Sequence, residues 1–174
     1  VLPVEMIREA DLYTINHEPV SSFDLMERAA GACYRWIAEK AEKSSLIRVI
    51  CGMGNNGGDG LAIARMLCNH GYETDVLIIR HSEHPSADFL ENLRLLGEQP
   101  GIVITDVFEN DPDLEIGEED IVIDALLGSG LNKPASGFVA GIIDTINQSG
   151  ALVISVDMPS GLFADKPADH KKNV

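Results

Sequence analysis

Short apolar strands alternate with amphipathic helices along this chain. Segments 76–79 (Val-Leu-Ile-Ile) and 121–123 (Ile-Val-Ile) are apolar at every position rather than at every second one. Strands of this kind are buried on both faces, as in parallel sheets covered by helices. The repeated strand-then-helix order therefore predicts an α/β fold with a doubly wound, mostly parallel sheet.

The expected elements follow from the apolar period along the chain. Met26, Ala30, Cys33 and Ile37 recur at helical spacing and predict one face of a helix. In all, we expect helices over residues 3–16, 22–43, 57–70, 87–96 and 137–148, and strands over 46–51, 75–79, 102–105, 120–127 and 152–157. The 174 residues are enough for one compact domain with a substantial core, spanning residues 1–174.

The composition limits the partners of this domain. The net charge is −15, and no Lys or Arg occurs from Gly101 to Asn132. Such a field repels a phosphate backbone, so we expect no nucleic-acid partner, and an anionic ligand must be held by local donors. No run of 18 apolar residues is present, so we expect no membrane span. Without a secretory signal or C-x-x-C spacing among the three cysteines, we expect reduced thiols and a cytoplasmic protein.

Three glycine-bearing loops follow strand ends, where parallel sheets bind their ligands. The first, residues 51–60, reads Cys-Gly-Met-Gly-Asn-Asn-Gly-Gly-Asp-Gly. Its glycines allow close backbone approach, and the start of the next helix offers free N–H groups to an anion. Asn55 and Asn56 add polar contacts. Asp59 repels phosphate and suits a ribose hydroxyl, a metal ion or proton transfer better.

The other two loops combine glycines with carboxylates. Residues 124–134 read Asp-Ala-Leu-Leu-Gly-Ser-Gly-Leu-Asn-Lys-Pro, and residues 155–162 read Ser-Val-Asp-Met-Pro-Ser-Gly-Leu. Asp124 lies within an apolar strand and Asp157 ends another, so each carboxylate needs a partner. The structural alternatives are a buried hydrogen bond for Asp124 and a cap for Asp157. Lys133 is either a ligand contact or a solvated residue beside a helix.

Several other classes of site fit these loops less well. Residues 52–57 satisfy G-x-G-x-x-G, but Arg-His at 80–81 replaces the acid that a dinucleotide oxidoreductase carries at the end of its second strand. Ser160 lacks the G-x-S-x-G frame of a serine hydrolase. No His has zinc-ligand spacing, whereas oxygen atoms of Asn56, Asp124 and Ser160 suit a hard monovalent or divalent ion.

Taken in order, the three loops resemble the YjeF N-terminal family, the NAD(P)HX epimerases. The resemblance rests on Asn-Asn-Gly-Gly-Asp-Gly at 55–60, Asp-Ala-Leu-Leu-Gly-Ser-Gly-Leu at 124–131, Asp-Met-Pro-Ser-Gly-Leu at 157–162 and Leu-Met-Glu-Arg-Ala at 25–29. It covers nearly the whole chain and implies a Rossmann-like three-layer αβα sandwich. The implied activity is that of an isomerase, which interconverts the R and S epimers of hydrated NADH or NADPH.

The same resemblance implies the site and the partners. Potassium would be the cofactor, bound by Asn56, Asp124 and Ser160. The substrate, NADHX or NADPHX, would be contacted by Asn55, Asn56, Gly57, Gly58, Asp59, Gly128, Ser129, Gly130, Leu131, Asn132, Lys133, Pro134 and Asp157. Family members are often homodimers, and they occur alone or fused to an ATP- or ADP-dependent dehydratase domain.

Two departures from the family pattern stand out. Met53 replaces the usual Pro in the first loop, which a turn that binds through its backbone should tolerate. Residues 163–174 are polar, whereas family members generally continue there with further strands. We therefore expect the domain to be incomplete at its C-terminal end.

Epimerisation at C6 needs a group that gives and takes a proton. The ring nitrogen can expel the C6 hydroxyl once an acid protonates it, and water can then return to either face; ring opening and reclosure is a second route. As a hypothesis, Asp157 is the catalytic group, Asp124 and the ion fix the geometry, and Lys133 binds phosphate or tunes Asp157. There are two competing functions. One is a nicotinamide-dependent oxidoreductase. The other is a non-catalytic scaffold or binding domain of the same fold, and a domain of that kind would have lost these polar loop residues.

Overall fold

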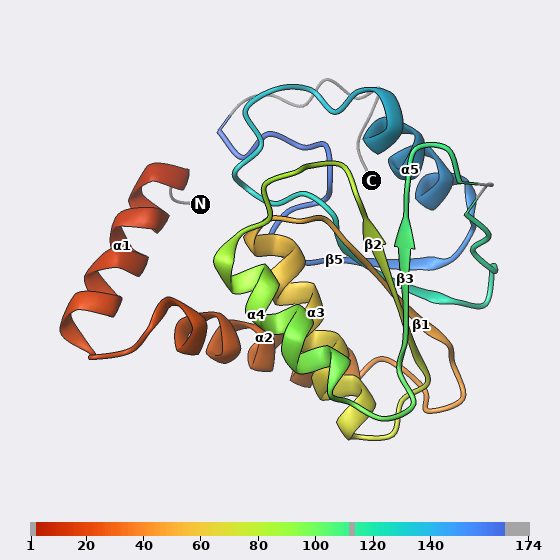
Figure 1. The fold of residues 1–174 in the computed structure, drawn as a ribbon, viewed down its shortest axis with the longest axis horizontal. Coiled ribbons are helices and arrows are strands. Elements are labelled where there is room, and N and C mark those ends of the chain that lie inside the picture. The colour runs from red at the N-terminus through yellow and green to blue at the C-terminus, as the bar shows by residue number, and fades with distance from the viewer. Residues whose placement is uncertain (1–2, 112–113, 166–174) are drawn as a thin grey trace.

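A computed structural model describes residues 3–111 and 114–165 of the chain (Figure 1). The elements in chain order are α1 (Val4–His17), α2 (Ser22–Ala38), β1 (Ile47–Cys51), α3 (Asn55–Asn69), β2 (Thr74–Ile79), α4 (Ala87–Gly97), β3 (Val103–Val107), β4 (Ile121–Ala125), α5 (Gly137–Gln148) and β5 (Leu152–Ser155). Among these helices none has the length and apolar character to cross a bilayer. Residues 166–174 of the polar segment 163–174 lie outside the described residues. For them, the absence of a strand stays a prediction.

The five strands form one parallel sheet in the order β3-β2-β1-β4-β5. β1 is central, and its last residue, Cys51, stands opposite Ile78 of β2 and Ala125 of β4. The chain winds outward from β1 to β3 and then returns to the other side of β1 for β4 and β5. This reversal creates a crevice at the carboxyl ends of β1 and β4, where doubly wound sheets bind ligands.

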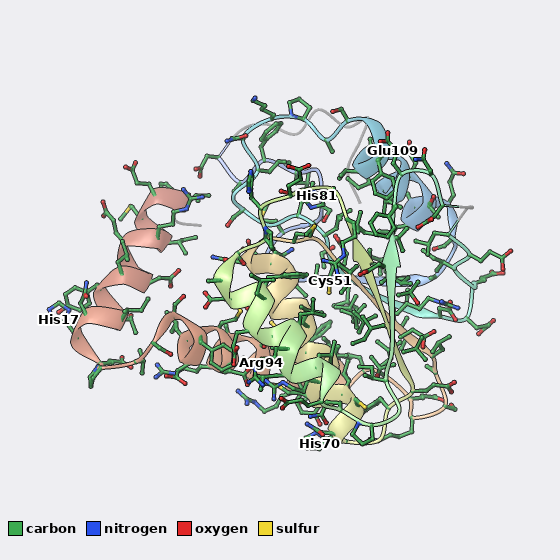
Figure 2. All side chains as sticks on the ribbon, in the orientation of Figure 1. His17, Cys51, His70, His81, Arg94 and Glu109 are labelled. Atoms are coloured by element: carbon green, nitrogen blue, oxygen red, sulfur yellow. The ribbon has the colours of Figure 1, made fainter. Side chains whose placement is uncertain are left out.

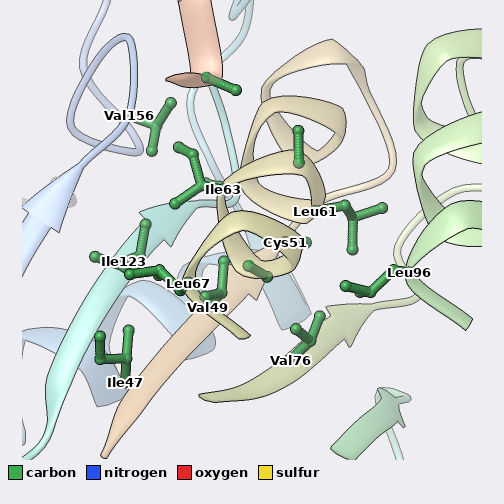
Figure 3. Close-up of a cluster of buried hydrophobic side chains, with 14 of the residues drawn as sticks. Ile47, Val49, Cys51, Leu61, Ile63, Leu67, Val76, Leu96, Ile123 and Val156 are labelled. Atoms are coloured by element: carbon green, nitrogen blue, oxygen red, sulfur yellow. The ribbon is translucent and has the colours of Figure 1, made fainter. Parts of the chain in front are cut away.

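Helices cover both faces of the sheet, which confirms the predicted α/β sandwich. On one face α3 packs against β1, β2 and β4 and against its neighbours α2 and α4. Leu61 and Leu67 of α3 belong with Val49 and Ile123 to the larger core (Figure 3). On the other face, residues of α5 such as Ile143 form the second core with side chains of the central strands.

The helix α2 begins as its sequence predicts but ends five residues sooner. Ser21 caps it: the Ser21 hydroxyl accepts from the Asp24 N–H at 3.0 Å, and the Asp24 carboxylate accepts from the Ser21 N–H at 3.3 Å. This reciprocal pair satisfies two amides that the helix itself cannot satisfy. The last buried side chain of the helix is that of Ile37. Its carbonyl accepts from the N–H groups of Lys40 and Ala41, which closes the helix in a turn.

The helix α3 begins at Asn55 rather than at residue 57, so both asparagines lie on its first turn and not in the preceding loop. Gly54 is the N-cap in an extended conformation, and its carbonyl accepts from the Gly58 N–H at 3.0 Å. The first-turn amides of a helix have no intrahelical acceptor. Asn55, Asn56 and the amides around them are therefore free to bind a ligand.

The strand boundaries also differ from those expected. β4 and β5 each end two residues early, at Ala125 and Ser155, while β3 extends to Val107. At β4 the cause is local, because the Asp124 carboxylate accepts from the Leu126 N–H at 3.2 Å. A side chain that captures a nearby amide competes with the strand ladder and turns the chain away from it.

The helix α1 stands at the side of the sandwich (Figure 1). It has no buried side chain, and its contact with the other helices is a small one with α2. Its first amide, that of Val4, donates to the carboxylate of Asp165 at 3.2 Å. The helix is thereby joined to the segment that follows β5.

Candidate active site

The loops after β4 and β5 are bound directly to one another at the carboxyl edge of the sheet. The Leu127 N–H donates to Ser160 Oγ at 2.8 Å, and the Ser129 N–H donates to Asp157 Oδ2 at 2.6 Å. The loop after β1 joins them, because the Gly52 N–H donates to a β4 carbonyl at 3.0 Å. The three loops therefore converge as the strand order requires.

A cavity of about 720 Å³ opens at this edge. Its walls come from α1, α2, the first turns of α3, the first turn of α4 and the loops that follow β2, β4 and β5. The predicted substrate-binding residues that line it are Asn55, Asn56, Asp59, Gly128, Ser129, Gly130, Leu131, Asn132 and Asp157. The structure thus brings predicted residues from all three loops to one cavity.

Four predicted contact residues are placed elsewhere. Gly57 and Gly58 are buried behind the cavity wall, where a Cβ on Gly57 would lie 1.9 Å from the Gly52 carbonyl oxygen. Gly57 therefore allows the first loop to pack against α3. A Cβ on Gly58 would lie 3.0 Å from Met26 Sδ and 3.3 Å from the Phe89 backbone nitrogen, so Gly58 allows α2 and α4 to approach α3. Lys133 and Pro134 are exposed and lie outside the cavity lining that the structure describes. Contact of these four with a substrate stays a prediction.

Asp157 is held in a specific pose by its backbone and by the neighbouring loop. Its φ of 61° lies in the left-handed region, which Asp tolerates better than most side chains. Its carboxylate accepts from Ser129, as above, and approaches Gly128 so closely that a Cβ there would lie 2.6 Å from Asp157 Oδ2. The same Cβ would lie 3.0 Å from Cβ of Asn56. Glycine at 128 is therefore what allows the three loops to close.

Asp124 and Ser160 form a buried pair beneath the cavity. Both are 0% exposed, and Ser160 donates to Asp124 from its hydroxyl at 2.6 Å and from its backbone N–H at 2.9 Å. The Ser155 hydroxyl donates as well, at 3.0 Å. Burial raises the pKa of Asp124 above its ordinary value, against the opposing effect of these hydrogen bonds. The carboxylate is thus fixed in place by donors from β5 and the loop that follows it.

Asn56 is the least satisfied polar group at this edge. It is buried, and neither the nitrogen nor the oxygen of its side-chain amide has a hydrogen-bond partner among residues 3–111 and 114–165. A buried polar group without a partner is costly and often indicates a bound ligand, water or ion. Its amide is therefore a candidate contact for either an ion or the substrate.

The described part of the chain contains no group of three or more His, Cys, Asp or Glu side chains that could hold a metal. Figure 2 shows His81 at the cavity end of the sheet, with His17 and His70 far from it. An ion at this site would therefore need amide and hydroxyl oxygens in addition to a carboxylate.

Asp59 is the carboxyl group whose protonation the cavity changes most. Its pKa is raised from 3.8 to about 7, chiefly by burial and then by the charges of Asp157, Asp88 and Asp11. The cavity therefore contains a group able to donate or accept a proton under physiological conditions.

Sequence reasoning did not predict the part of the cavity lining that comes from α2 and α4, and it missed two further parts that carry polar or charged groups. His81 follows β2 and packs against Gly52, and burial lowers its pKa, so its ring is neutral at pH 7. Applying the strand-end rule to β2 would have found it. The second part is the face of α1 that carries Val4, Arg8 and Asp11. No pattern in the sequence ties that helix to the three loops.

Comparison with known proteins places these observations in a family. The family model of the YjeF-related protein N-terminus matches residues 22–174. An NAD(P)H-hydrate epimerase of Lentilactobacillus buchneri is 38% identical over 165 residues, which cover 94% of this chain and 74% of that protein. The enzyme of the same name from Limosilactobacillus fermentum is 37% identical over 166 residues, covering 93% and 75%.

Two further relatives extend the comparison. The bifunctional NAD(P)H-hydrate repair enzyme Nnr of Thermofilum pendens is 36% identical over 145 residues, which are 81% of this chain and 27% of that protein. The crystal structure of yeast ynu0 shares the fold with a TM-score of 0.81 at 24% identity, covering 99% of this chain and 76% of that one. The match of the family model over most of the sequence and the identity to these relatives show that the chain belongs to the YjeF-related protein N-terminus family.

Proposed function

We propose that this chain is an NAD(P)H-hydrate epimerase, an isomerase that interconverts the R and S forms of hydrated NADH and NADPH. The observation that carries the proposal is the cavity in which Asp59 and Asp157 converge at the carboxyl edge of the sheet. Relatives that are 37–38% identical over nearly all of this chain carry that activity in their names. Family membership and a cavity with titratable carboxyl groups therefore support the same reaction.

Binding of the dinucleotide would use the backbone as much as side chains. The free amides at the start of α3 are suited to anionic and carbonyl oxygens. In the 128–134 loop the Ser129 and Leu131 amides already donate within the protein, so contacts there would use the other amides. Asn55 and Asn56 add donors and acceptors from the first helical turn. We propose contacts from residues 55–59, from residues 128–134 and from Asp157.

The proton transfer would be carried out by Asp157. Its protonated carboxyl group would donate to the C6 hydroxyl, which leaves as water while the ring-nitrogen lone pair forms a carbon–nitrogen double bond. Water then adds to either face of C6 and returns a proton to the Asp157 carboxylate, so that atoms and charge balance. Asp59 is a second carboxyl group able to supply a proton near pH 7. Two carboxyl groups in different environments form a pattern common in acid–base enzymes.

A potassium ion would bind to Asn56, Asp124 and Ser160. The fit rests on the unpartnered buried amide oxygen of Asn56 and on the buried Asp124–Ser160 pair. These oxygen donors carry a single negative charge, as suits a hard monovalent cation. When bound, the ion would supply a fixed positive charge beside the carboxylates of the site.

The first experiment measures conversion of purified R-NADHX to the S epimer by chromatography, in potassium chloride and in choline chloride. We expect conversion by the wild-type protein, faster in potassium. The Asp157→Asn variant should lose it while retaining substrate affinity, and the matched control Asp144→Asn, which changes an exposed carboxyl group of α5, should not.

The function, the role of Asp157 and the potassium site are each contradicted by a different result. An inactive wild-type protein would exclude the function. Full activity of Asp157→Asn would exclude only the role of that residue. Equal rates and equal thermal stability in the two salts would exclude the potassium site.

Three further features are proposed from the family. We propose one epimerase domain over residues 1–174, a homodimer and a cytoplasmic location. This chain matches 27% of a bifunctional NAD(P)H-hydrate repair enzyme Nnr, which supports the proposal that a domain of this kind can be fused to a dehydratase domain. Light scattering coupled to size exclusion tests the dimer, which a monomeric mass across the micromolar range would contradict.

A further inference from the structure

We propose that Arg8 of α1 binds a phosphate group of the dinucleotide, so that α1 forms part of the substrate-binding site. The inference rests on the proposed function and adds a residue and a helix to it. Three observations carry the inference: the face that α1 presents to the cavity, the position and free donors of Arg8, and the charge of the surrounding wall.

The first observation is the placement of α1. Its residues Val4, Ile7, Arg8, Asp11 and Ile15 line the cavity. These positions recur every three or four residues and therefore share one face of the helix. Because α1 has no buried side chain, this face does not serve the core. The hydrogen bond from its first amide to Asp165 holds the N-terminal end of the helix beside the loops.

The second observation is the position of the Arg8 side chain. Its guanidinium lies beside Gly130, where a Cβ would come within 3.5 Å of Arg8 Nη2. The 128–134 loop is one of the proposed dinucleotide contacts. Arg8 forms no hydrogen bond or ion pair with any residue of the segments 3–111 and 114–165. Its five donors are therefore available to a ligand between α1 and the glycine turn.

The third observation is the charge of the cavity wall. The described lining carries the carboxyl groups of Asp11, Asp59, Asp88 and Asp157, and Arg8 is its only Lys or Arg. A pyrophosphate brings two negative charges into a protein whose net charge is −15. The nearby Ser129 amide already donates to Asp157. A guanidinium matches the geometry of phosphate oxygens. Arg8 therefore supplies the positive charge that a phosphate group requires beside these carboxyl groups.

The test compares two ligands that differ in their phosphates, ADP-ribose and adenosine, by isothermal titration. Arg8→Ala should weaken ADP-ribose binding about 10- to 100-fold and leave adenosine binding unchanged. Arg8→Lys should recover part of the loss, because Lys retains the charge but not the planar fork. The matched control is Arg28→Ala, since Arg28 lies on α2, outside the cavity lining, in an exposed ion pair with Glu18 at 2.9 Å.

The outcomes separate this inference from the proposed function. If the wild-type protein epimerises NADHX but Arg8→Ala binds ADP-ribose as tightly as the wild type, only the role of Arg8 fails. If ADP-ribose binding depends on Arg8 but no epimerisation occurs, the function fails and the phosphate contact stands. Failure of the wild type to bind ADP-ribose, or equal weakening of both ligands, would overturn the inference. Circular dichroism of Arg8→Ala should match the wild type, because α1 contributes no buried side chain.

Discussion

Replacing Asp59 by Asn should stabilise the folded protein, and the gain should grow with pH. The pKa of this carboxyl group is raised from 3.8 to about 7, chiefly by burial. An ionised Asp59 is therefore a cost to the folded state that an uncharged amide of nearly the same shape does not carry. The substitution removes a penalty that the site imposes on the fold.

The pH window follows from the two pKa values. Below about pH 4 the group is protonated in both folded and unfolded chains, and Asp59 contributes no difference. As pH rises toward 7, the unfolded chain releases the proton first, so the folded state loses about 1.4 kcal/mol per pH unit. The penalty is about 2 kcal/mol at pH 5 and about 4 kcal/mol at pH 8, beyond which it no longer grows.

Urea unfolding at pH 5 and pH 8 measures the effect. We expect the free energy of unfolding of Asp59→Asn to exceed that of the wild type by roughly 2–3 kcal/mol more at pH 8 than at pH 5. Asp144→Asn, which removes the same charge from the surface of α5, should show no such growth. A gain that is equal at the two pH values would refute the reasoning, because it would mean that Asp59 ionises in the folded protein as it does in the unfolded chain.

Two further substitutions test the geometry of the site. Gly128→Ala should reduce epimerisation at least tenfold, because the added Cβ would lie only 2.6 Å from the Asp157 carboxylate and would displace it. The control Gly141→Ala on α5, where a Cβ meets nothing within 4 Å, should leave the rate unchanged. A normal rate for Gly128→Ala would contradict the predicted displacement. Ser160→Ala should lower the free energy of unfolding by about 1–3 kcal/mol, because it removes a hydroxyl that is hydrogen-bonded to buried Asp124 at 2.6 Å. Denaturant unfolding measures this change. An unchanged free energy of unfolding would show that the hydrogen bond contributes nothing to stability.

The sheet was predictable from sequence because strands such as β2 and β4 contain apolar runs without alternation, and because a helix follows most of the strands. Only β3 and β4 follow one another with no helix between them in the described residues. That pattern leaves few arrangements besides a doubly wound parallel sheet. The convergence of the three loops followed from the same pattern, since the ends of parallel strands meet at one edge. What the sequence could not indicate was where a strand stops. The ladder at β4 ends because the Asp124 side chain captures the Leu126 amide, and such local competition leaves no periodic signal.

The site was only partly predictable for a related reason. Asn55 and Asn56 were expected in a loop because glycines and asparagines are poor helix formers, yet the first turn of α3 tolerates them. The cavity wall formed by α1 could not be found, because a helix with an exposed, weakly amphipathic pattern gives no indication of what it lies beside. The sequence also could not indicate that Gly57 and Gly58 are closely surrounded by other atoms, and their contact with a substrate stays a prediction.

The helix α3 carries Asp59 at its cavity end and much of the larger core along its length. Amide hydrogen exchange at Asp59 should therefore be as slow as that of the core, because exposing this backbone requires opening the helix that holds the sheet together. Asp157 sits on a surface loop and can exchange through a local fluctuation. We therefore expect one carboxyl group of the pair to belong to the most cooperative unit of the protein, and the other to a segment that opens locally.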